Sequence, residues 1–154
     1  MRSSPRARAV AGCGALLAGL AALGLAAGDA GAGARPGGPA VLGPGEVTVE
    51  LGIEHSTFDT ARIRVRQGTE VRFVLANGDP ILHELIVGPP EVHRRHEDGT
   101  EASHPPRPGE VTVEPMATAA TTYAFDDAGV LEFACHLPGH RAYGMAGVVE
   151  VVPG

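Results

Sequence analysis

Apolar and polar residues alternate along most of the chain from Glu46 onward. Val47, Val49 and Leu51 are separated by polar residues, so one face of this segment is expected to be buried and the other exposed. The same period of two recurs between turn sequences such as Asn77-Gly78-Asp79-Pro80. The pattern predicts about eight short strands, near 47–51, 62–66, 71–76, 82–87, 110–116, 121–125, 130–134 and 146–152.

One long segment lacks this alternation. Residues 88–109 contain five Pro and many charged residues, and we expect a long exposed excursion with at most one short helical turn. No other part of the chain favours a helix. Many short strands with regularly spaced turns are typical of an all-β sandwich, which is the fold class we predict.

The N-terminal 34 residues have a different composition. Arg2, Arg6 and Arg8 precede an uncharged run at 9–27, and small residues follow, as in a secretory signal peptide. An uncleaved anchor is the alternative, and the sequence ending at Cys13 also resembles a lipidation motif. A Gly- and Pro-rich linker is predicted at 35–45, and the folded domain at 46–154. We therefore expect a secreted or periplasmic protein, or one at the outer face of the cytoplasmic membrane. It would touch the membrane only through a retained or lipidated N-terminus.

The charge is acidic and unevenly distributed. The whole chain has a formal net charge of −6, all 12 of its basic residues are Arg, and 8 of these oppose 17 Asp or Glu after residue 35. An acidic surface excludes nucleic acid as a partner and favours cations or basic proteins. We expect a monomer.

The chain has two Cys, and only Cys135 lies in the predicted domain, so no disulfide is expected there. Cys135, His140 and Met145 are spaced five residues apart in one loop between two predicted strands. Thiolate, imidazole and thioether together suit copper, and a blue-copper site adds a second His. His83, at the entrance of a predicted strand, is our candidate for that ligand.

These residues resemble the cupredoxin family, the plastocyanin- and azurin-like type 1 copper proteins. The resemblance covers about residues 46–152, and it rests on the Cys135-x4-His140-x4-Met145 loop and the upstream Asn77-x5-His83. It implies a Greek-key β-sandwich and one copper ion per chain, cycling between Cu(I) and Cu(II). The implied ligands are His83, Cys135, His140 and Met145.

Four further residues are predicted to support the site. By resemblance, Asn77 would hold the His83 loop and the carbonyl of Leu82 would lie on the axial side opposite the Met ligand. Glu84 and His136 follow ligands directly. Strand alternation points His136 away from the metal, so we expect a supporting or surface role for it. Met116, the other Met of the domain, is expected in the core.

His93, His96 and His104 lie together in the Pro-rich excursion. They could form a weaker second metal site or a copper-capture arm. The plainer alternative is three solvated His in a loop.

Two functions follow from these patterns. The first is an exported type 1 copper electron carrier with a redox partner protein that docks near His140. The second is a copper-handling protein for resistance, storage or delivery, which exchanges copper with a donor or acceptor, and the His-bearing excursion favours it. An enzyme is disfavoured because no group is recognised that would orient a base for Cys135, and a binuclear copper site would need a second Cys in the loop.

Overall fold

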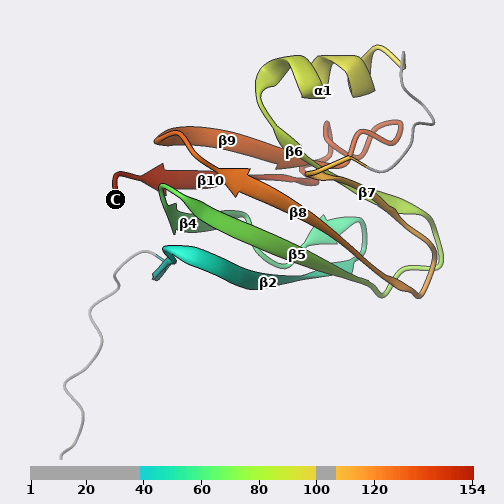
Figure 1. The fold of residues 1–154 in the computed structure, drawn as a ribbon. Helices are drawn as coiled ribbons and strands as arrows, with labels where there is room; N and C mark the ends of the chain where they lie inside the picture. The colour runs from blue at the N-terminus through green and yellow to red at the C-terminus, as the bar shows by residue number, and fades with distance from the viewer. Residues whose placement is uncertain (1–38, 100–106) are drawn as a thin grey trace, which may run out of the picture. The chain divides into compact units, whose positions relative to one another are not determined.

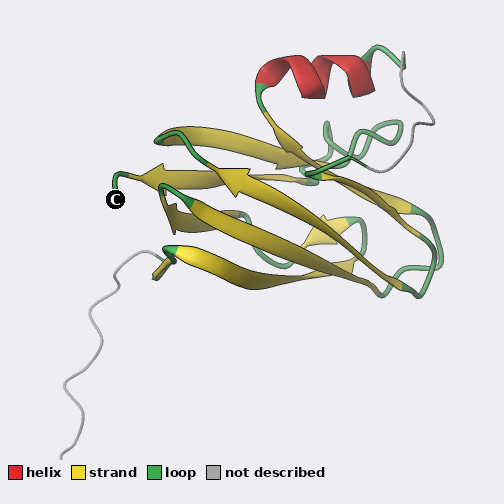
Figure 2. Ribbon diagram, viewed as in Figure 1, coloured by secondary structure: helices red, strands yellow, loops and turns green. Residues whose placement is uncertain are grey.

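The computed structural model describes residues 39–99 and 107–154, which form two facing β-sheets and one helix (Figures 1 and 2). The predicted leader, residues 35–38 of the predicted linker and His104 lie outside the described residues. The elements are β1 (Val41–Leu42), β2 (Gly45–Glu54), β3 (Thr57–Phe58), β4 (Arg62–Arg66), β5 (Thr69–Asn77), β6 (His83–Gly88), α1 (Pro90–Glu97), β7 (Glu110–Val113), β8 (Thr118–Phe125), β9 (Gly129–Ala134) and β10 (Ala146–Val152).

The predicted β-sandwich is confirmed. One sheet has the order β1-β4-β10-β9-β6-β7, and the other has the order β3-β2-β5-β8. β2 pairs in parallel with β5, and β4 pairs in parallel with β10, so the chain crosses repeatedly between the sheets. The strands that hold the predicted site, β6 and β9, are hydrogen-bonded neighbours in the larger sheet.

The core lies between the two sheets and follows the sequence alternation. In β5 the side chains of Val71, Phe73 and Leu75 are fully buried, whereas Glu70 and Arg72 are exposed. Phe133 of β9 is buried and packs edge-on against Phe58, with ring centroids 5.4 Å apart. This packing gives β9 a fixed position just before Cys135.

The expected exposed excursion at 88–109 is wrong over its first half. Pro90–Glu97 is a two-turn helix, α1, that packs on β6 and stands above the larger sheet in Figure 1. Pro90 starts it favourably because proline has the φ angle that the first helical position requires. The buried face is carried by His93, a polar residue, so the helix gave no apolar periodicity in the sequence. No helix among the described residues is long and apolar enough to cross a membrane.

The expectation that Met116 belongs to the core is also wrong. Its side chain is 70% exposed, and its backbone has a φ of 56° in the turn between β7 and β8. The backbone N–H of Met116 donates to the carbonyl of Asp79 at 3.1 Å, which ties this turn to the turn before β6.

Gly147 of β10 is needed where it lies opposite Phe133 of the neighbouring strand β9. A Cβ atom at this position would lie 2.2 Å from the Phe133 ring and 2.7 Å from the carbonyl oxygen of Ala61. We expect Gly147→Ala to lower the free energy of unfolding by about 1–3 kcal/mol, because a buried ring and a backbone atom must both move. Urea unfolding of the metal-free protein measures this. Gly154→Ala, whose Cβ would meet nothing closer than 3.8 Å, is the control, and equal midpoints for the two variants would contradict the prediction.

Candidate metal centre

The loop between β9 and β10 brings three of the predicted ligands to one end of the sandwich. The Cys135 N–H donates to the carbonyl of Met145 at 3.1 Å, and the Met145 N–H donates to the carbonyl of His140 at 3.0 Å. Gly139 and Gly144 have φ angles of 87° and 99°, which a residue with a side chain rarely adopts. The loop therefore folds back on itself and closes with its own backbone hydrogen bonds.

His83 reaches the same place from β6, where it is fully buried. The turn before it is held by Asn77, whose Nδ2 donates to the carbonyls of Ile81 at 2.8 Å and Glu114 at 3.0 Å. The Asn77 Oδ1 accepts the Asp79 N–H at 2.9 Å. Asn77 thus links the turn before β6 to the end of β7 and fixes where the His83 backbone begins.

The ligand atoms of His83, Cys135 and His140 all lie within 4.8 Å of one another. Cys135 Sγ is 3.4 Å from His140 Nδ1, and the two imidazole centroids are 5.0 Å apart. Cys135 and Met145 are fully buried, and His140 is half-buried. Two imidazoles and a thiol that converge in this way would hold one copper ion, and Met145 shares the buried cluster that contains Cys135.

The side chain of His83 shows that this arrangement suits a metal. Its Nε2 lies 3.0 Å from Asp79 Oδ2, whereas its Nδ1 is buried and has no hydrogen-bond partner. A buried nitrogen without a partner costs free energy. The carboxylate holds the ring proton on Nε2, so Nδ1 presents a lone pair to the site, which is the usual arrangement of a metal-binding His.

Asp79 contacts the candidate ligand His83, and the sequence reasoning missed it. Its carboxylate accepts the backbone N–H groups of His55 at 2.8 Å and Ser56 at 2.7 Å as well as the contact with His83. The N–H of Ser56 is the main cause that lowers the pKa of Asp79, against the effect of burial. The signal in the sequence was an Asp four residues before a ligand His, within a turn that was interpreted only as a strand terminator.

We expect Asp79→Asn to weaken copper binding by about 10- to 100-fold, the usual cost of losing a group that orients a ligand. An amide offers only one oxygen, so its NH₂ group would face either a backbone N–H or the protonated Nε2 of His83. Competition with a chelator measures the affinity. The control Asp59→Asn makes the same change of charge at an exposed residue, and equal affinities for the two variants would contradict the prediction.

Burial favours the uncharged forms of the Cys135 thiol and the His140 imidazole. Burial raises the pKa of Cys135, which opposes a bare thiolate; backbone N–H groups of Glu84 and Leu137 act in the opposite direction. Burial and then the neighbouring His83 lower the pKa of His140. A neutral imidazole and a thiol that ionises against a cation are the forms that bind copper.

The structure places the other predicted residues around the loop. Glu84 Oε1 accepts the backbone N–H of His136 at 2.8 Å, which connects β6 to the loop just after Cys135. Leu82 is half-buried directly before His83; the axial position of its carbonyl stays a prediction. The side chain of His136 contacts residues of α1, as described next.

His93 and His96 of the excursion are not solvated loop residues. His93 is 3% exposed, and the side chain of His96 is 6% exposed, so the plainer alternative is wrong for both. His93 Nδ1 lies 2.8 Å from His136 Nε2, and the ring of His96 stacks on that of His136 with centroids 5.9 Å apart. The structure therefore brings His93 and His96 to His136, a residue that the sequence analysis did not group with them, whereas His104 is not described.

A β-sandwich with two His and one Cys gathered at one end, of which His83 and Cys135 are fully buried, defines a mononuclear copper protein. The family model of the plastocyanin/azurin copper-binding proteins matches residues 45–152, and the chain belongs to this family. Copper is thus its cofactor, as the sequence predicted.

Three known proteins are similar to this chain. A protein of Rubrivivax gelatinosus named copper-resistant cuproprotein CopI is 41% identical over 97 residues, 61% of this chain and 59% of that protein. A protein of the same name from Pseudomonas aeruginosa is 31% identical over 149 residues, 76% of this chain and 82% of that protein. The solved structure of auracyanin A, a blue copper protein from Chloroflexus aurantiacus, superposes with a TM-score of 0.56 at 23% identity. That match covers 70% of this chain and 99% of auracyanin A, and it shows the fold.

Proposed function

We propose that the protein binds one copper ion through His83 Nδ1, Cys135 Sγ and His140 Nδ1, with Met145 as a fourth and weaker ligand, and that it transfers single electrons. The observation that carries the proposal is the convergence of three ligand atoms within 4.8 Å, one of them a buried nitrogen without a partner. Bound copper supplies a Cu(I)/Cu(II) couple of one electron.

The protein contributes a fixed and largely dry environment. Asp79 orients His83, and the hydrogen bond from His136 to Glu84 holds the loop against β6. Because the polypeptide holds the ligands in place, little rearrangement is needed when the charge of the site changes. Water is excluded on the inner side by Cys135 and Met145, which are both fully buried.

An electron would leave through His140, the half-buried ligand. Tyr143, which is 90% exposed, lies three residues after it in the loop, and Ile81, which is 45% exposed, precedes His83 by two residues. Exposed apolar side chains of this kind suit a brief encounter with a redox partner protein. The acidic composition would favour a partner with a basic surface.

Copper handling is the second candidate function, because relatives carry the name copper-resistant cuproprotein. In that role the same ligands would receive copper from a donor and release it to an acceptor. The N-terminal sequence supports export under either function, to the periplasm or the outer face of the membrane.

The rates of electron self-exchange and of copper release distinguish the two functions. The protein with one equivalent of Cu²⁺ should first show an intense visible absorption band. Electron self-exchange is then measured by NMR line broadening in mixtures of Cu(I) and Cu(II) protein, and copper release by transfer to a competing chelator. Fast self-exchange with slow release supports the electron carrier. Slow self-exchange with ready transfer supports copper handling, and a missing visible band contradicts the proposed ligand set.

A further inference from the structure

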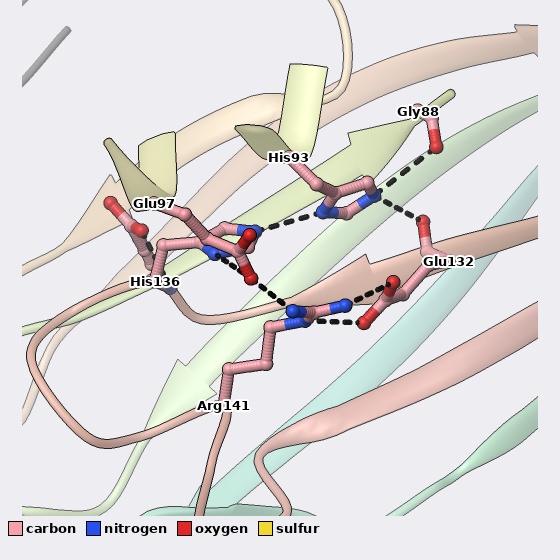
Figure 3. Close-up of polar contacts among 7 residues, drawn as sticks. Gly88, His93, Glu97, Glu132, His136 and Arg141 are labelled. Carbon is pink, nitrogen blue, oxygen red and sulfur yellow. Dashed lines mark hydrogen bonds and ion pairs between the residues drawn. The ribbon is translucent and has the colours of Figure 1, made fainter. Parts of the chain in front are cut away.

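A second group of polar side chains lies beside the copper loop, between it and α1. Figure 3 shows His136 between His93 and Glu97, and Arg141 between Glu97 and Glu132. His136, Glu97, Glu132 and Arg141 line a surface hollow of about 510 Å³. The side chain of His136 is 1% exposed, whereas those of Glu97 and Arg141 are 39% and 40% exposed.

The hydrogen bonds of His93 determine which nitrogen of His136 carries the proton. His93 Nε2 lies 3.1 Å from the carbonyl of Gly88 and 3.2 Å from that of Glu132, so it must donate. In a neutral His93 the other nitrogen, Nδ1, is then an acceptor, and the group 2.8 Å away must be the protonated Nε2 of His136. The chain of bonds leaves Nδ1 of His136 with a lone pair.

This Nδ1 atom is buried and has no hydrogen-bond partner. Glu97 Oε1 lies 3.9 Å from it, too far for a hydrogen bond. A lone pair and a carboxylate oxygen that face each other can share a cation, although this Oε1 atom is already paired with Arg141. Two ligand atoms at about 2.0–2.1 Å from one ion lie roughly 2.9–4.1 Å apart for bond angles from about 90° to 180°. The observed separation falls within this range.

We propose that His136 Nδ1 and the Glu97 carboxylate form a second, weaker site for a divalent transition-metal ion, separate from the copper centre. Imidazole and carboxylate suit Cu²⁺ and Zn²⁺, and Cu²⁺ binds more tightly by the Irving–Williams order. Water fills the remaining positions from the open side of the hollow. His93 acts as a positioning residue, since it fixes the ring proton of His136 on the nitrogen that faces away from the metal.

Arg141 would compete with the metal ion for the carboxylate of Glu97. It forms an ion pair with Glu97, and it also binds both carboxylate oxygens of Glu132 at 2.7 Å and 2.9 Å. Because the guanidinium retains its two bonds to Glu132, Glu97 can turn to the metal while Arg141 stays in place. Its positive charge makes the site weaker than it would otherwise be.

The test uses the full chain with two equivalents of Cu²⁺ added in sequence, followed by electron paramagnetic resonance and absorption. The first equivalent should give the thiolate band, and the second an ordinary Cu²⁺ signal with nitrogen hyperfine structure from one imidazole. Glu97→Gln and His136→Gln should each weaken binding of the second equivalent by at least about tenfold, since losing a ligand costs no less than losing a supporting group. Arg141→Gln should tighten it by up to about fivefold.

Matched controls keep the outcomes distinct. Glu91→Gln makes the same change on the exposed side of α1, and His104→Ala removes a His that lies outside the described residues; both should leave the second equivalent unchanged. Glu97→Gln should also leave the thiolate band of the first equivalent unchanged. The proposal is overturned if Glu97→Gln and His136→Gln bind the second equivalent as the unchanged protein does, or if His104→Ala abolishes it. Failure of the copper centre itself would appear separately, as a missing band.

Discussion

The Cys135→Ser variant is expected to bind Cu²⁺ without the intense visible absorption of the unchanged protein. That absorption arises from charge transfer between a thiolate and Cu²⁺, and a Ser hydroxyl neither ionises near neutral pH nor offers a soft donor. The imidazoles of His83 and His140 remain, so a pale Cu²⁺ complex with an ordinary electron paramagnetic resonance signal should form. Absorption and resonance spectra after one equivalent of Cu²⁺ measure both effects.

Cys13→Ser is the matched control, because it makes the same substitution at the other Cys of the chain. It should retain the full band. A band that persists in Cys135→Ser would show that Cys135 is no copper ligand, and it would contradict the proposed electron-transfer site. Because residue 135 is buried, copper would reach the site of the folded protein slowly. Both variants should therefore be loaded with copper directly and also after unfolding and refolding.

Phe133→Ala is expected to have the largest effect on stability, a loss of about 3–5 kcal/mol in the free energy of unfolding. Phe133 is fully buried, packs against Phe58 and fills the space above Gly147, so its removal leaves a cavity between the sheets. The loss is a large part of the roughly 5–15 kcal/mol that stabilises an ordinary domain. Urea unfolding of the metal-free protein measures it.

Val130→Ala is the control on the same strand, because its side chain is 65% exposed and should cost well under 1 kcal/mol. Phe133 lies two residues before Cys135 on β9, so Phe133→Ala should also speed the loss of bound copper. A variant as stable as Val130→Ala would contradict the packing that is described for the core.

The strands and the clustering of candidate ligands in one loop were predictable from the sequence because both depend on local spacing. The alternation of apolar residues such as Val71, Phe73 and Leu75 with polar ones indicates directly which face of a strand is buried. The interval of five between Cys135, His140 and Met145 lies within one loop, and the chemistry of the three side chains indicates copper without knowledge of the fold. His83 lies far from this loop in the sequence, and it was chosen because a blue-copper site needs a second His and because it stands at the entrance of a strand.

Other features had no local signal. α1 was missed because the residue that it buries is His93, which is polar and is satisfied by the carbonyls of Gly88 and Glu132. Met116 was assigned to the core because it is apolar, yet the turn that follows β7 places it in solvent. In both cases the environment of the side chain, and not its own polarity, decided its burial.

The sequence by itself therefore determined the class of fold, the copper chemistry and the residues that converge in one loop. Only the tertiary structure decided which groups support them: Asp79 at the buried ring of His83, and His93 with Glu97 at the buried ring of His136. These contacts join residues on separate elements. Their geometry depends on how β6, α1 and the copper loop pack, because hydrogen bonds and metal ligation act over a few ångströms in space and leave no fixed interval along the chain.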